Sequence, residues 1–229
     1  MIQLRNFGDK RQTSWCAFCG GLTENKDHCP SLVFLDKPYP DNLQKVLSCL
    51  DCNESFSKDE EYMACLLEAV IAGSADPEKI GRKKIQRSLQ NQSLLKKRIS
   101  SSMIVQDDGS VFFRPDEKRF INVITKLAKG HCLFYLNEPH FSSPDYISIK
   151  PFPMMSAKER EFFESPTNID LLPEVGSRAM QNIIEGSSDI LGGWVVVQPD
   201  RYRYTWNSKN GITIKIVIRE YLAASVTWN

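Results

Sequence analysis

The fold is decided by a cysteine-rich stretch near the start of the chain, residues 16–53, which read CAFCGGLTENKDHCPSLVFLDKPYPDNLQKVLSCLDCN. A Cys-x-x-Cys pair stands at each end, Cys16 with Cys19 and Cys49 with Cys52. Two such pairs match the ligand spacing of a tetrahedral zinc site. We therefore predict that the four thiolates bind a structural zinc ion. The alternative is that they are small core residues or reactive thiols.

Composition sets the outer limits. The chain has 229 residues, of which 41% are hydrophobic, enough for one large domain or two small ones. It shows no secretory signal and no apolar run of the roughly 20 residues that a membrane helix needs. We expect a cytoplasmic protein, in which cysteines bind metal rather than form disulfides. Buried inert thiols are the expectation for the remaining cysteines, Cys29, Cys65 and Cys132.

Between the two pairs, an Asp27-His28 step combines two kinds of chemistry. A carboxylate is a ligand for a hard cation, and an imidazole can accept a proton near neutral pH. A lone histidine beside an aspartate is more often a hydrogen-bonded structural residue, and we give that role to His131 and His140. The flanking cysteine pairs favour a functional role for His28.

Four elements in this stretch resemble the HNH endonuclease family, whose members have a ββα-metal fold. They are CAFC, DHCP, DNLQ and CLDCN, in that order, and the resemblance covers roughly residues 13–70. It departs from the common pattern at the last position, where Asn53 stands in place of histidine.

The resemblance implies a role for each matching residue. His28 would be the general base that deprotonates the attacking water, and Asn42 would brace the loop that orients its ring. Asp27 and Asn53 would hold one catalytic Mg²⁺ or Mn²⁺ ion. From the residues alone, Asn42 could equally form a turn and Asn53 could begin a helix.

A basic segment follows this region. The net charge is only +1, so attraction to nucleic acid must come from a local patch. Between Lys79 and Gln106 there is no acidic residue. We predict phosphate contacts there, the alternative being a solvated helix face. The candidate nucleic-acid-binding residues are Arg82, Lys83, Lys84, Arg87, Lys96, Lys97 and Arg98.

The fold prediction is α+β in three segments: a zinc-clipped ββα module over residues 1–75, a basic helical connector over 76–103, and an α+β domain over 104–229. The pair Ser57 and Glu60 predicts a helix start. The run Ile99–Met103 predicts a loop. Alternating isoleucines after Asn210-Gly211 predict an antiparallel hairpin at the end of the chain.

Together these observations predict a metal-dependent endonuclease that hydrolyses DNA, most naturally double-stranded. A double-strand break would require a homodimer or a larger protein assembly, because one such site cuts one strand. Similar tails occur among bacterial HNH proteins assigned to defence, although no motif carries that link. Two alternatives stay open: a zinc-containing module that binds nucleic acid without cleaving it, and a nuclease that acts on RNA.

Overall fold

The computed structural model describes residues 10–41, 43–107, 109, 111–165, 175–184, 193–207 and 211–229. The chain forms two compact units, one of Met1–Glu54 with Ile124–Asn229 and the other of Ser55–Val123. These units cut across the predicted segment boundaries. Both helices and sheets are present, so the α+β class is confirmed. Within the described ranges, no helix has both the length and the apolar character required to cross a membrane.

The first unit opens with a short helix, α1 (Lys10–Thr13), and an antiparallel strand pair, β1 (Asn25–Cys29) and β2 (Gln44–Ser48). A 3₁₀ turn, η1 (Leu32–Phe34), lies between the strands. Alternate residues of β2 are buried, as expected of a strand with one face on a core. The strand pair leads into helix α2 (Leu50–Ala72).

Helix α2 begins seven residues before the predicted start at Ser57, so that prediction was wrong. Two contacts explain the earlier start. The Leu50 N–H donates to Glu24 Oε2 at 2.9 Å, and the Cys52 N–H donates to Cys49 Sγ at 3.4 Å. These acceptors satisfy backbone donors of the first turn that have no partner within the helix. The second cysteine pair therefore starts the helix.

The second unit contains the rest of α2 and the basic segment. That segment forms the 3₁₀ turn η2 (Pro77–Lys79) and two helices, α3 (Lys83–Asn91) and α4 (Ser93–Ser102). Helix α4 includes most of the run expected to be a loop, and Ser102 Oγ donates back to Ile99 O at 2.7 Å. A hairpin of β3 (Met103–Val105) and β4 (Val111–Phe113) follows.

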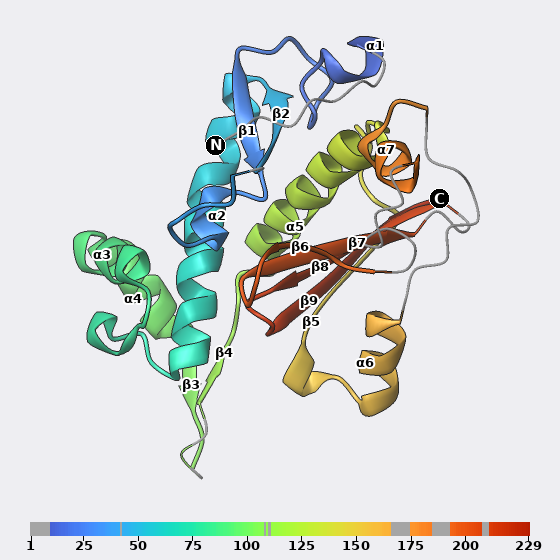
Figure 1. Ribbon diagram of the computed structural model, residues 1–229. Coiled ribbons are helices and arrows are strands. Elements are labelled where there is room, and N and C mark those ends of the chain that lie inside the picture. Colours follow the sequence, from blue (N-terminus) through green and yellow to red (C-terminus); the bar gives the residue numbers. More distant parts are fainter. Residues whose placement is uncertain are drawn as a thin grey trace. The chain divides into compact units, whose positions relative to one another are not determined.

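A five-stranded antiparallel sheet dominates the C-terminal part of the first unit (Figure 1). Its strands are β5 (Tyr146–Pro151), β6 (Val195–Gln198), β7 (Tyr202–Asn207), β8 (Ile212–Ile218) and β9 (Leu222–Trp228), in the order β5-β9-β8-β7-β6. The predicted antiparallel pairing of β7 with β8 is confirmed. Asn210 of the predicted turn lies outside the described residues.

One face of this sheet packs on helix α5 (Glu117–His131), whose residues from Ile124 onward belong to the first unit. A π-helical turn, η3 (Cys132–Leu136), extends α5 past Gly130. The His131 ring stacks on Tyr204 with 3.7 Å between ring centroids, and its Nε2 lies 2.7 Å from the Tyr202 hydroxyl. His131 therefore has a structural role, as expected.

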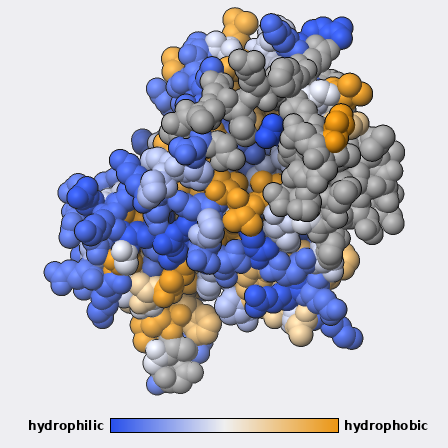
Figure 2. All heavy atoms as spheres, in the orientation of Figure 1, coloured by the Kyte–Doolittle hydropathy of each residue, from blue (hydrophilic) through white to orange (hydrophobic). Residues whose placement is uncertain are grey.

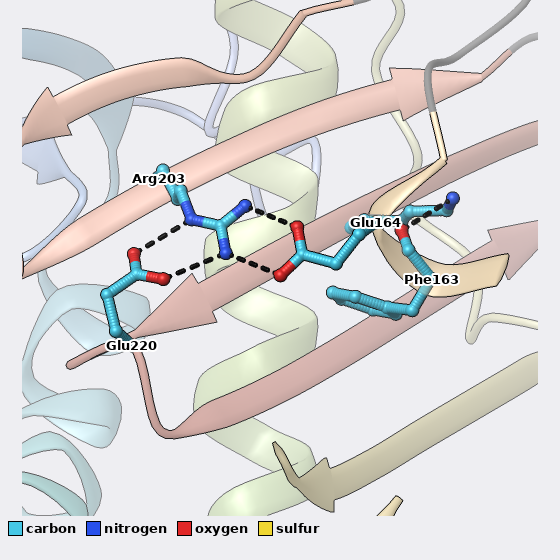
Figure 3. A network of polar contacts seen from close by, with 5 residues as sticks. Phe163, Glu164, Arg203 and Glu220 are labelled. Atoms are coloured by element: carbon cyan, nitrogen blue, oxygen red, sulfur yellow. Dashed lines mark hydrogen bonds and ion pairs between the residues drawn. The ribbon is translucent and has the colours of Figure 1, made fainter. Parts of the chain in front are cut away.

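On the opposite face, Val217 of β8 and Ala223 of β9 form a small buried cluster with Phe152 and Phe163. The turn η4 (Phe152–Met154) and helix α6 (Ala157–Glu164) supply its phenylalanines. Arg203 on β7 makes paired 2.8 Å hydrogen bonds to Glu164 and to Glu220, which tie α6 to the sheet (Figure 3). Another short helix, α7 (Arg178–Ile184), completes the described elements.

Candidate functional site

The four cysteines of the two pairs come together as predicted. Their Sγ atoms all lie within 4.8 Å of one another. Cys19 Sγ and Cys49 Sγ are 3.8 Å apart. In a tetrahedron of sulfur atoms around zinc, with Zn–S bonds of about 2.3 Å, neighbouring sulfurs are about 3.8 Å apart. The cluster thus has the size and donor set of a structural zinc site.

Ionisation of these thiols is unequal. Burial opposes the ionisation of Cys16, but N–H groups of Cys49, Phe18 and Cys19 outweigh burial and hold its pKa at about 7. Burial and the neighbouring thiols raise the pKa of Cys52. Four thiolates this close repel one another, and a bound divalent cation would offset this electrostatic repulsion. This combination favours metal binding over four free thiols.

A buried lysine that sequence reasoning missed lies beside the cluster. Lys129 Nζ on α5 donates to Phe141 O at 2.9 Å and to Phe18 O at 3.3 Å. Burial lowers the pKa of Lys129, while the charges of Cys52, Cys19 and Cys16 raise it. A zinc ion with four thiolates would carry net negative charge, and Lys129 would offset part of it.

The Asp27-His28 step lies on β1, directly before Cys29, the last residue of that strand. Successive side chains of a strand point to opposite faces, so the two lie on different sides of the β1–β2 pair. Asp27 is buried and His28 is half-buried. His28 Nε2 is inaccessible to solvent and has no hydrogen-bond partner among the described residues.

The charges around His28 favour its neutral form. Burial lowers the pKa of His28, Lys45 on the facing strand and Lys126 lower it further, and Asp27 opposes them. The net shift is downward from the ordinary value, so the imidazole is uncharged at neutral pH. An uncharged imidazole can accept a proton, and Nε2 would have to become exposed for a water molecule to reach it.

Asp27 is held by a second buried lysine. Lys126 Nζ on α5 lies 2.7 Å from Asp27 Oδ2 and donates to Ser31 Oγ at 2.7 Å. The Lys126 side chain is 3% exposed. The sequence does contain a signal for this lysine. A lysine that interrupts the apolar face of a helix is a candidate buried charge.

The two predicted asparagines have different outcomes. Asn53 lies in the first turn of α2, half-buried, and its backbone N–H donates to Cys49 O at 3.2 Å. Asn42 lies outside the described residues. In the part of the chain that the structure describes, the four cysteines form the single cluster of three or more Cys, His, Asp or Glu close enough to share one ion. A second cation would thus draw on few protein ligands.

The predicted nucleic-acid-binding residues divide into two groups. Arg82 is buried and pairs with the buried Glu68 at 3.5 Å, which does not suit it for phosphate contact. The others are exposed on α3 and α4: Lys83, Lys84, Arg87, Lys96, Lys97 and Arg98. Their side chains are therefore open to an anionic partner.

An open groove of about 660 Å³ in the second unit collects part of this charge. Lys97, Arg98 and Arg114 line it together with Ser101 and Ser102. Within the described ranges, these three cations are in no ion pair.

Beside the groove, the β3–β4 hairpin exposes apolar side chains, seen at the lower edge of Figure 2. They include Ile104, Val105 and Phe112.

Comparison with family models, curated proteins and solved structures gives no match for this chain.

Proposed function

We propose that this protein is a metal-dependent endonuclease that hydrolyses phosphodiester bonds in DNA, with His28 as the general base. The observation that carries the proposal is the state of His28. Its imidazole is uncharged at neutral pH, its Nε2 has no partner among the described residues, and a buried carboxylate precedes it on the same strand. The order of β1, β2 and α2 around the four-cysteine cluster agrees with the HNH resemblance.

In this mechanism the His28 imidazole accepts a proton from a water molecule. The water oxygen forms a bond to phosphorus while the bond from phosphorus to the 3′ oxygen breaks. The departing 3′ oxygen takes up a proton from solvent water, which leaves a 5′-phosphate and a 3′-hydroxyl. The lowered pKa keeps His28 ready to accept a proton across the neutral range. General bases of this kind contribute about 10²- to 10⁴-fold to the rate.

Asp27 and Asn53 are the residues that would hold a catalytic cation. A carboxylate and an amide oxygen suit Mg²⁺ or Mn²⁺. Lys126 holds the Asp27 carboxylate in place by an ion pair. The cation would stabilise charge on the phosphate and on the departing oxygen. The few protein ligands leave room for water and for a phosphate oxygen.

The four-cysteine cluster has a separate, structural part in the proposal. It joins the loop before β1 to the start of α2, the helix that carries Asn53. A zinc ion there would fix these two segments to each other without reacting itself.

Contact with the DNA backbone is assigned to the exposed cations of α3 and α4 and to the groove of Lys97, Arg98 and Arg114. Phosphate contacts of this kind fix position rather than sequence. The proposal therefore extends to DNA of any sequence, and a homodimer or larger assembly would be needed to cut both strands.

The test is cleavage of supercoiled plasmid by zinc-loaded protein, with and without added Mg²⁺. We expect nicking that requires Mg²⁺ and that falls at least about 100-fold in His28→Ala. The matched control is His140→Ala, another partly buried histidine, which stacks on Trp228 and should leave nicking intact. Equal nicking by wild type and His28→Ala would refute the role of His28.

The rival function is a zinc-containing module that binds nucleic acid and cleaves nothing. It is favoured if the zinc-loaded wild type binds plasmid but stays inert with Mg²⁺ and with Mn²⁺. Cleavage of a single-stranded RNA of matched length, in preference to plasmid, would instead assign the same chemistry to RNA. A module that only binds nucleic acid needs no proton acceptor at His28. We therefore prefer hydrolysis as the function.

A further inference from the structure

The C-terminal half of α5 is fitted closely to β1. Cys29 Sγ lies 3.6 Å from Leu127 O and 3.5 Å from His131 Nδ1. A Cβ atom on Gly130 would stand 2.7 Å from the same sulfur, so the helix can approach the strand this closely only with glycine there. Residues 126, 127, 130 and 131 share one helix face. The close packing of α5 against β1 thus places Lys126 beside that strand.

At the end of that approach, the Lys126 ammonium is enclosed by protein. It contacts Asp27 Oδ2 and Ser31 Oγ, both at 2.7 Å, and lies 5.7 Å from the centre of the Phe18 ring. All three partners are buried. A buried ammonium persists only when a counter-charge lies close to it. The Asp27 carboxylate supplies that charge, and Ser31 Oγ accepts a hydrogen bond from Lys126. The Lys126–Asp27 pair is therefore a built feature of the site.

This pair bears directly on cation binding at Asp27. A divalent cation that coordinates the Asp27 carboxylate would meet a positive charge 2.7 Å from one oxygen of that group. Repulsion between close charges is strong where water is excluded. The cation must either displace Lys126 from Asp27 or bind against its charge, and both lower its affinity.

We propose that Lys126 is a resident cation that competes with the divalent cation for Asp27. This inference rests on the proposed function, because it takes Asp27 as a ligand of the catalytic cation. Without the divalent ion, Lys126 holds the carboxylate in position by its ion pair. With it, Lys126 sets the affinity low, so that the site fills only at high concentrations of Mg²⁺ or when bound substrate adds phosphate oxygens as ligands.

The test measures Mn²⁺ affinity by electron paramagnetic resonance on zinc-loaded protein without nucleic acid. We expect Lys126→Met to bind Mn²⁺ at least tenfold more tightly than wild type, Lys126→Arg to bind it as wild type does, and Asp27→Asn to bind none at this site. The matched control is Lys118→Met, which removes the same charge from an exposed position on the same helix and should leave the affinity unchanged. An unchanged or weaker affinity in folded Lys126→Met would overturn the competition.

A second measurement avoids substitution, since Lys126→Met leaves a buried carboxylate unpaired and can fail to fold. In wild-type protein labelled with ¹⁵N-lysine, the Lys126 Nζ resonance should shift as Mg²⁺ is added. A resonance that stays fixed while Mg²⁺ binds at Asp27 would contradict competition. Neither measurement needs cleavage, so tighter Mn²⁺ binding by Lys126→Met combined with inert plasmid would support the competition and refute the nuclease. Unchanged Mn²⁺ binding by Lys126→Met combined with plasmid nicking would refute the competition and support the nuclease.

Discussion

Two antiparallel arrangements in the same unit are held together in different ways. The β1–β2 pair has two short strands beside four clustered thiols and two buried lysines. The β5–β9 sheet has five strands, with aromatic and β-branched side chains buried against α5 and α6. We therefore expect the first to depend on charge and on a bound metal ion, and the second on apolar packing. The candidate site lies at the first of these two arrangements.

The strongest test of this difference is removal of a predicted zinc ligand in Cys49→Ser. Structural zinc binding in small sites supplies on the order of 10 kcal/mol, far more than the β1–β2 pair can recover from its own packing. We expect the bound zinc to be lost and the amides of β1 and β2 to exchange rapidly with solvent, while those of β7 and β8 stay protected. Zinc content and hydrogen exchange are the measurements.

The control for that experiment is Cys132→Ala, which alters a buried thiol outside the cluster. It should retain zinc. Simultaneous loss of protection in the sheet of Cys49→Ser would show that the two regions do not differ as described.

The converse test weakens the sheet. Ile216 is fully buried on β8, and Ile216→Ala should lower the free energy of unfolding by about 3 kcal/mol because it leaves a cavity. Zinc content should not change. Denaturant unfolding gives the loss, and Val196→Ala, at an exposed position on β6, is the control with little expected effect. A loss of zinc in Ile216→Ala would contradict the separation.

Acid should act on the sheet through His131. Burial lowers the pKa of His131 to about 3, whereas in the unfolded chain it titrates near its ordinary value of 6.5. The unfolded state therefore takes up a proton first as the pH falls. Stability is lost by about 1.4 kcal/mol for each pH unit between these two values.

This loss can be assigned with the double variant His131→Phe, Tyr202→Phe, which removes both partners of the 2.7 Å hydrogen bond. Its stability should fall less steeply between pH 6.5 and pH 4 than that of wild type. Equal slopes would place the acid sensitivity elsewhere, for example at His28.

The smallest expected effect is at the ion pairs of Arg203. Burial opposes the charge of Arg203, but its bonds to Glu164 and Glu220 outweigh burial and raise its pKa. The site is partly open to solvent, so Glu164→Gln should cost only about 1 kcal/mol. High salt should reduce the difference from wild type. A cost equal to that of Ile216→Ala would show that the sheet, too, depends mainly on charge.

The sequence predicted the features that depend on local spacing. Two Cys-x-x-Cys pairs were enough to predict the four-cysteine cluster, and alternating isoleucines were enough to predict β8. The start of α2 was predicted wrongly because Ser57 and Glu60 form a capping pattern, while the actual first turn is supported by Cys49 Sγ and by Glu24 from another segment. Local patterns do not reveal such distant acceptors.

The lysines of α5 show the same limit at the candidate site. Lys126 lies 99 positions after Asp27 in the sequence, and only the fold brings the two together. Arg82 shows the reverse, because a cation in an acid-free segment was expected to be exposed and instead pairs with Glu68 from the preceding helix. Charge patterns along a chain indicate how much charge is present but not which charges are buried.

The close contact at Gly130 has a consequence for any attempt to recombine this protein with another. With no room for a Cβ atom beside Cys29 Sγ, a library that randomises position 130 should return glycine alone among variants that keep the contact. A chimaera that replaces α5 would have to carry Gly130 and Lys126 as a pair with β1. The two segments are distant in sequence, but they would have to be exchanged together.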